Sequence, residues 1–366
     1  MEAIIVIVIV LFVVLALLRS ASNRQGSRSA GGGGGAPRAP QNAREPYRTG
    51  ALPEKLGLAP DVPLTETAER LERAFAASFG SSLKRRVLDK YPRMTEAEYD
   101  WKLLELKRYL LLNAVLKSVP MFSSEVDDIW HEMLMFTREY ETFCESWNGR
   151  TVHHAPHGEA VPMPGERAWF DWVYSQLFVP TPYSGQIWRG FFRHPLDEKL
   201  IRTFETESDD SIVGAVFNRA SSERNPEAGR TIGLLVRRMK EQIAANRAAA
   251  SSPQAAVRQE ARSPNAAFTD SAGYGMLASS MLLFSMTDPL DYERRMEEVL
   301  PEEEKRNQSS CGGSACTAYD GEGGDGSNGD SGSDSGGGSD SGGGSDGGSS
   351  SCSSSSCSSG CGGGGD

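Results

Sequence analysis

Residues 126–157, VDDIWHEMLMFTREYETFCESWNGRTVHHAPH, decide the fold because they combine a regular apolar pattern with four of the five histidines of the chain. Apolar residues recur there every three or four positions, which is the spacing of one face of an α-helix. Ser124 is a suitable N-cap, and Asn148-Gly149 is a typical helix end. We therefore expect one continuous amphipathic helix, whose apolar stripe contains Val126, Ile129, Trp130, Met133, Phe136, Tyr140, Phe143, Cys144 and Trp147.

The polar side of this helix carries a candidate metal site. Asp127 and His131 are four residues apart, so their side chains lie next to each other on the helix surface. The segment after the helix reaches at most ~24 Å when extended, which is enough to run back along it. Imidazole and carboxylate groups are common zinc ligands. The sequence therefore predicts a divalent metal site, for example for zinc, in which Asp127 and His131 are joined by His153, His154 or His157.

Cys144 offers a second arrangement near the end of the same helix. It can pair with His153 or His154, either as a metal ligand or as a thiol nucleophile with a histidine as its base. On one continuous helix His131 and Cys144 are ~20 Å apart, so the two residues cannot share one ion. The position of Cys144 in the apolar stripe also fits a small core residue.

Two further hypotheses concern the same helix. Trp130, His131 and Arg138 are candidates for contact with a protein partner. A purely structural interpretation instead assigns Trp130 to the core and pairs His131 with Asp127 on the surface. The residues alone leave the metal site, the partner site and the structural role open.

The order of side chains in this stretch carries a resemblance. The pattern W-H-x5-T-x-x-Y-x-x-F-C, followed by H-H-x-P, resembles the signature of the glycine-rich domain-containing protein family, most closely its bacterial members. The resemblance covers residues 83–178 and implies no established catalytic activity. Plant relatives carry a second histidine two residues after the first, where this chain has Met133. The matching residues are Val126, Asp127, Trp130, His131, Thr137, Tyr140, Phe143, Cys144, His153, His154 and Pro156.

Catalytic motifs find little support in the sequence. It contains no G-x-S-x-G, G-x-x-x-x-G-K-[ST] or H-E-x-x-H pattern. His131-Glu132 begins like the last of these, but Met135 stands where the second histidine is required. We therefore expect a membrane-anchored binding or scaffold protein of unknown specificity. The alternative is a metal-dependent or thiol enzyme built on His131, Cys144 and the loop of His153 and His154.

The N-terminal residues 3–18, AIIVIVIVLFVVLALL, carry no charge and span about 24 Å as a helix. We interpret them as a transmembrane anchor, because a cleaved signal peptide requires a basic start and a small-x-small cleavage site. Arginines follow the anchor, so the positive-inside rule predicts an N-terminus outside and a cytoplasmic body. These arginines are Arg19, Arg24, Arg28 and Arg38.

Composition divides the rest of the chain. The predicted domain is mainly helical and cytoplasmic, with a small β element possible between residues 150 and 225. Its clearest helices are 64–79, 96–117, 166–178 and 231–248, and Thr95 to Glu98 form a capping box before the second. The predicted segments are a basic flexible linker at 19–50, the domain at 51–249, a linker with short amphipathic pieces at 250–307, and a disordered tail at 308–366.

The tail is rich in glycine, serine, aspartate and cysteine, and its cysteines have the loose spacings C-x4-C and C-x4-C-x3-C. These fit either a metal or oxidation site or a low-complexity tail. The formal net charge of −11 comes partly from this tail, and no aromatic-basic platform accompanies the linker arginines. We therefore expect a membrane and an unknown protein as partners, and no nucleic acid. The tail cysteines are Cys311, Cys316, Cys352, Cys357 and Cys361.

Overall fold

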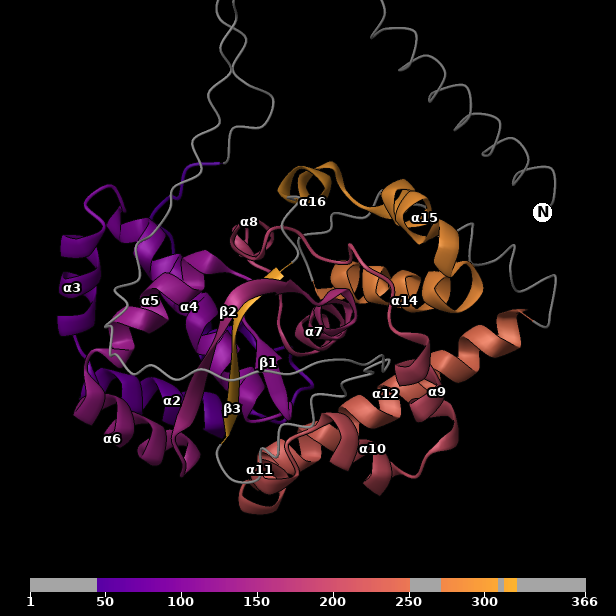
Figure 1. Ribbon diagram of the computed structural model, residues 1–366, viewed down its shortest axis with the longest axis horizontal. Coiled ribbons are helices and arrows are strands. Elements are labelled where there is room, and N and C mark those ends of the chain that lie inside the picture. Colours follow the sequence, from indigo (N-terminus) through magenta and orange to yellow (C-terminus); the bar gives the residue numbers. More distant parts are fainter. Residues whose placement is uncertain (1–44, 251–270, 309–312, 321–366) are drawn as a thin grey trace, which may run out of the picture. The chain divides into compact units, whose positions relative to one another are not determined.

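The computed structural model describes residues 45–250, 271–308 and 313–320, which form a mainly helical body with one small sheet (Figure 1). The helices are α2 Thr65–Ser78, α3 Ser82–Lys90, α4 Glu96–Asn113, α5 Ser124–Leu134, α6 Thr137–Asn148, α7 Pro164–Leu177, α8 Ser184–Trp188, α9 Glu198–Thr206, α10 Asp209–Val216, α11 Arg219–Arg224, α12 Pro226–Ala250, α14 Ser271–Thr287, α15 Tyr292–Val299 and α16 Glu302–Asn307. The strands are β1 Ser118–Pro120, β2 Val152–Pro162 and β3 Gly313–Asp320. Two 3-10 turns, η1 Glu54–Gly57 and η2 Pro289–Asp291, complete the set.

The transmembrane part of the predicted fold class requires correction. Within the described ranges, no helix combines the length and the apolar character needed to cross a bilayer. The long helix α12 carries charged residues along its length, and the apolar helix α14 has only 17 residues. Residues 3–18 lie outside the described residues. The described helices thus do not support the predicted single-pass topology and membrane localisation, with the N-terminus outside and a cytoplasmic body.

Helix α4 runs through the core and begins where the sequence predicts. Thr95 is its N-cap, and its side-chain oxygen accepts a hydrogen bond from the backbone N–H of Glu98 at 3.1 Å. Buried residues occur on all sides of this helix, which explains why its apolar stripe is so broad in the sequence. Helices α2, α3, α5 and α8 all contact it.

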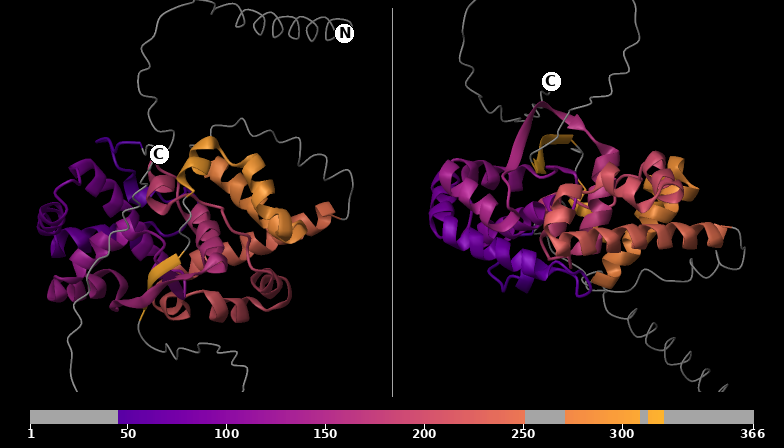
Figure 2. Two further views of the ribbon diagram at one scale, coloured as in Figure 1. Left: turned by 45° about the horizontal axis from the view of Figure 1, so that its top comes forward. Right: turned by 90° about the horizontal axis from the view of Figure 1, so that it is seen from below.

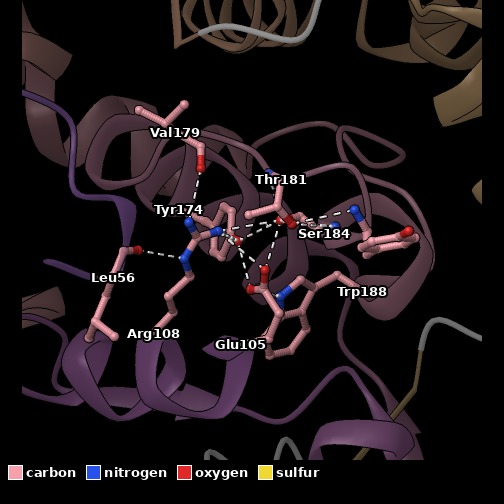
Figure 3. A network of polar contacts seen from close by, with 9 residues as sticks. Leu56, Glu105, Arg108, Tyr174, Val179, Thr181, Ser184 and Trp188 are labelled. Carbon is pink, nitrogen blue, oxygen red and sulfur yellow. Dashed lines mark hydrogen bonds and ion pairs between the residues drawn. The ribbon is translucent and has the colours of Figure 1, made fainter. Parts of the chain in front are cut away.

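A polar network joins α4 to α7 and α8 inside the core (Figure 3). Glu105 and Arg108 of α4 are both fully buried, and Arg108 Nη1 lies 3.2 Å from Glu105 Oε1. The Glu105 carboxylate accepts hydrogen bonds at 2.7–2.8 Å from three side chains of α7 and α8. Every charge is thus paired, as burial requires. The partners in the network are Leu56, Tyr174, Val179, Ser184 and Trp188.

The predicted continuous helix is broken into α5 and α6. Phe136 leaves the helical conformation, with φ −93° and ψ 61°, and caps the start of α6. Its ring packs edge-on against Phe79 at a centroid distance of 6.0 Å. The break turns α6 so that its apolar face lies along α2. Ser123, rather than Ser124, caps α5, and Gly149 ends α6 in the left-handed conformation, as its position predicts.

The sheet has the strand order β1-β3-β2, and both pairs are antiparallel. Strand β2 confirms a β element in the predicted region. Strand β3 comes from residues 313–320, which composition assigns to a disordered tail. In Figure 2, the magenta β2 and the orange β3 lie side by side. Residues 321–366 of the predicted tail lie outside the described residues.

The folded body also extends past the predicted boundary at residue 249. Helix α14 packs against α7, α12 and α15. Ser285 of α14 accepts a hydrogen bond from the backbone N–H of Leu196 at 2.9 Å. Ser279 and Ser285, two of the serines that interrupt this apolar segment in the sequence, also donate to backbone oxygens one turn earlier in α14. The buried residues of α14 include Leu277, Ala278, Met281 and Leu282.

Candidate metal centre

Helix α5 places Asp127 and His131 on one side, one turn apart. His131 Nδ1 lies 3.0 Å from the backbone oxygen of Asp127 and 3.5 Å from Asp127 Oδ2. The side chain of His131 is 49% exposed, whereas that of Asp127 is 13% exposed. The pair therefore sits at the surface, with the carboxylate on the sheltered side.

Strand β2 brings His154 to this pair. His154 Nε2 lies 3.2 Å from Asp127 Oδ1, and its side chain is 7% exposed. The His154 ring meets the rings of Trp130 and His131 edge-on, at centroid distances of 4.6 Å in both cases. One possible ligand atom from each of Asp127, His131 and His154 lies within 4.8 Å of the other two.

A buried link holds β2 against α5 at this point. Trp130 Nε1 donates to the hydroxyl of Tyr140 at 3.2 Å, and that hydroxyl donates to the backbone oxygen of Val152 at 2.6 Å. Burial raises the pKa of Tyr140 far above its usual value, so the phenol stays neutral and remains a donor. Tyr140 therefore connects the residue before His131 to the strand that carries His154.

The hydrogen bonds also determine which nitrogen of His131 is available. A backbone carbonyl can only accept, so the contact with the Asp127 oxygen places the proton of a neutral His131 ring on Nδ1. The lone pair is then on Nε2. Metal-bound histidines commonly use this arrangement, in which the second ring nitrogen donates to a backbone or carboxylate oxygen.

The distances suit a single small ion. A tetrahedral ion with ligands at about 2.1 Å separates two ligand atoms by roughly 3.4 Å. The 3.2 Å between His154 Nε2 and Asp127 Oδ1 is close to that value; without an ion this contact is a hydrogen bond from the ring to the carboxylate, and a bound ion would take the place of the Nε2 proton. The ligand atom of His131 lies within 4.8 Å of those of Asp127 and His154.

The remaining predicted residues lie elsewhere. Cys144 is fully buried in the core on α6, and it is absent from the cluster of possible ligands in the described residues. His153 is exposed and lies next to His154 on the strand, where neighbouring side chains point to opposite faces. His157 belongs to the part of β2 whose side chains are not described. The sequence predictions that pair Cys144 with His153 or His154 therefore gain no support from the geometry.

The predicted partner-binding set is divided as well. Trp130 has no exposed surface, so its role is to pack against His154 and to bond Tyr140. Arg138 is exposed near the start of α6. Only His131 and Arg138 of this set are therefore accessible to another molecule.

The positioning role of Tyr140 was not part of the prediction from sequence. Its place in the quoted pattern, ten residues after Trp130, is the only signal that points to it. The structure explains this spacing because it lets the phenol reach across the α5–α6 break to the indole. Phe143 and Cys144 of the same pattern fill the core beside it.

One comparison with known proteins matches the segment of sequence that contains this centre. A family model described as UCP032817-like matches residues 69–167, which is less than a third of the chain and runs from α2 to the start of α7. The match includes Asp127, His131 and His154. A search of curated proteins and a search of solved structures gave no match to this chain. The resemblance to the glycine-rich domain-containing proteins stays a prediction.

Proposed function

We propose that this protein binds one divalent transition-metal ion, with zinc as the first candidate, through Asp127, His131 and His154. The observation that carries the proposal is the convergence of three ligand atoms within 4.8 Å of one another. Two of the residues come from α5 and the third comes from β2, 27 positions from Asp127 in the sequence. The tertiary fold is required to assemble this group, unlike a chance pair on one helix.

The types of ligand narrow the choice of metal. Two imidazoles and one carboxylate suit zinc and other late first-row ions, whereas calcium and magnesium prefer sites made of oxygen alone. Structural zinc sites are usually closed by four protein ligands, while catalytic sites keep a position open. With three protein ligands and a half-exposed His131, an ion here would have its open position toward solvent.

The function that follows is metal-dependent binding of a small ligand at the open position. A bound ion of this class polarises an oxygen-bearing ligand or activates a water. Around it, this chain supplies a sheltered carboxylate, a buried indole wall and one exposed imidazole. The buried position of Trp130 favours this function over a protein-docking surface built on Trp130, His131 and Arg138.

The test is a zinc titration of the full chain, purified without a metal-affinity step. All five tail cysteines are replaced by serine beforehand, because their thiols would bind zinc independently. We expect one equivalent of zinc to bind. His131→Ala lowers the affinity by at least tenfold, because it removes one ligand from an exposed position where the fold is not disturbed. A tenfold or larger loss of metal affinity is typical when the residues of a metal site are replaced.

His153→Ala is the matched control, since His153 is an exposed histidine next to His154 and is not part of the cluster. Its affinity for zinc should equal that of the parent chain. Equal affinities for the His131→Ala and His153→Ala chains, or no zinc binding by the parent, would overturn the proposal.

A further inference from the structure

We propose that β3 is a detachable strand that holds the metal centre together: residues 313–320 fill an acceptor between β1 and β2, and their release separates His154 from Asp127. The effect on metal rests on the proposed function. The docking of the strand itself does not.

The position of β3 in the sheet is the first argument. In the described residues, β1 and β2 do not pair with each other, and each pairs with β3. Ala318 lies opposite Val119 of β1 on one side and opposite His154 of β2 on the other. A single row of the sheet therefore runs from β1 through Ala318 to the metal-ligating residue.

The second argument is that β1 belongs to the fixed part of the body. Val119 is fully buried, and its backbone oxygen accepts a hydrogen bond from the hydroxyl of Tyr109 in α4 at 2.5 Å. Three residues after β1, Ser123 caps α5 and donates to the backbone oxygen of Ile187 at 2.7 Å. Strand β1 and helix α5, which carries Asp127 and His131, are thus anchored together.

Strand β2 is held near His154 from two sides. On the side of the body, Tyr140 bonds to the Val152 oxygen, and His154 contacts Asp127, Trp130 and His131. On the other side lies β3, with which β2 pairs from Val152 to Pro156 before the register becomes irregular. Removal of β3 would leave β2 as an unpaired strand, and the backbone around His154 would lose its ladder of hydrogen bonds.

The sequence of β3 suits a strand that can leave and return. Its residues are GSACTAYD, most of them small, and its main chain pairs with a strand on each side. This is the manner in which extended peptides add to a sheet. Helix α16 ends at Asn307, six residues before β3, and its buried Glu304 accepts a hydrogen bond from the backbone N–H of Phe191 at 3.1 Å. A released strand would therefore stay close to its acceptor, and its effective concentration would remain high.

The test uses the full chain with the five tail cysteines replaced by serine. Ala318→Pro removes an N–H from a strand that is paired on both sides, where proline is not accommodated. Ser331→Pro, eleven residues after the end of β3, is the matched control. We measure hydrogen exchange of the His154 and Ala155 amides without metal, and then the affinity for zinc.

We expect Ala318→Pro to speed exchange of these amides by at least tenfold and to weaken zinc binding by at least tenfold, while Ser331→Pro changes neither. The octapeptide of residues 313–320, with serine in place of Cys316, should restore both properties to the Ala318→Pro chain. The same peptide with proline in place of Ala318 should restore neither. Recovery in trans separates release of the strand from general damage to the fold.

The two proposals fail in different ways. If the parent chain binds no zinc, the proposed function is wrong, and the exchange measurement alone then decides the role of β3. Unchanged exchange at His154 and Ala155 in the Ala318→Pro chain would overturn the inference. So would zinc affinity that is unchanged while exchange becomes faster, because the strand would then not hold the metal centre.

Discussion

His154 Nε2 lies 3.2 Å from Asp127 Oδ1, although the two residues are 27 positions apart and belong to a strand and a helix. This contact joins α5 and β2, the two elements that carry the three proposed metal ligands. Helix α5 presents Asp127 and His131 together, and β2 supplies the third ligand.

Tyr140→Phe tests the link between α5 and β2. The change removes the hydroxyl that accepts from Trp130 Nε1 and donates to the Val152 oxygen, leaving two buried polar groups without this partner. We expect a loss of about 1–3 kcal/mol in the free energy of unfolding, measured in urea. We also expect weaker zinc binding, since His154 follows Val152 closely.

The control for this variant is Thr142→Ala, an exposed position on the same helix, whose stability should change by less than about 0.5 kcal/mol. A Tyr140→Phe chain that is less stable but binds zinc with unchanged affinity would limit Tyr140 to a structural role.

Arg108→Met tests the buried network of α4. It leaves the fully buried Glu105 carboxylate without its cationic partner. Breaking a buried pair in this way costs about 3–5 kcal/mol. Arg202→Ala breaks the exposed pair of Arg202 with Glu198 and should cost less than about 1 kcal/mol. Similar unfolding free energies for the two variants would contradict the structural role given to the network.

Glu304 predicts a dependence of stability on pH. Burial raises the pKa of its carboxyl from 4.5 to about 7, although Tyr274 and the Phe191 N–H act in the opposite direction, and Asp171 and Glu303 raise it further. The folded state therefore binds more protons than the unfolded state between pH 4.5 and 7. The Glu304 carboxyl therefore makes its full contribution to the free energy of unfolding below pH 4.5. This contribution is lost as the pH rises through 7, by about 3 kcal/mol in total.

Glu304→Gln should flatten this decline in thermal or urea unfolding measured from pH 4.5 to 7.5. Some decline will remain, because burial also raises the pKa of Asp171, from 3.8 to about 6. Glu297→Gln, at an exposed position of α15, should keep the slope of the parent chain. Identical slopes for Glu304→Gln and the parent would show that Glu304 is ionised at neutral pH in the folded protein.

Gly149→Ala tests the end of α6, immediately before β2. Gly149 has φ 74°, and an added Cβ would meet no atom within 4 Å, so the penalty comes from the backbone conformation alone. We expect a loss of about 1–2 kcal/mol. Gly233→Ala in α12 also meets no atom, but there the backbone is helical, and the change should raise stability by about 0.4–1 kcal/mol. If Gly149→Ala and Gly233→Ala changed the free energy of unfolding in urea in the same direction, the left-handed conformation assigned to Gly149 would be wrong.

Local signals in the sequence predicted much of the helical body. The side chain of Thr95 and the glycine at position 149 mark helix ends that the structure confirms. The spacing of Asp127 and His131 was enough to place them side by side, because four residues make about one helical turn. The sequence could not show that His154, rather than His153, joins Asp127 and His131. That depends on which face of β2 lies against α5, and no local pattern in the sequence predicts it.

Long-range packing accounts for the parts that sequence reasoning missed. The break at Phe136 follows from the packing of its ring on Phe79 and cannot be seen in an apolar period that continues across it. Strand β3 has a composition typical of disorder, and it gains its structure from pairing with strands about 160 to 200 positions earlier. Helix α14 has apolar residues on all sides and no distinct apolar face, so its sequence pattern did not show that it packs into the body.

The measurement that tests the metal centre most directly is zinc X-ray absorption on the full chain with its five tail cysteines replaced by serine and one equivalent of zinc added. The account predicts a shell of nitrogen and oxygen ligands with the scattering of two imidazoles, falling to one in His131→Ala and staying at two in His153→Ala. A shell without imidazole scattering, or one that His131→Ala leaves unchanged, would contradict it.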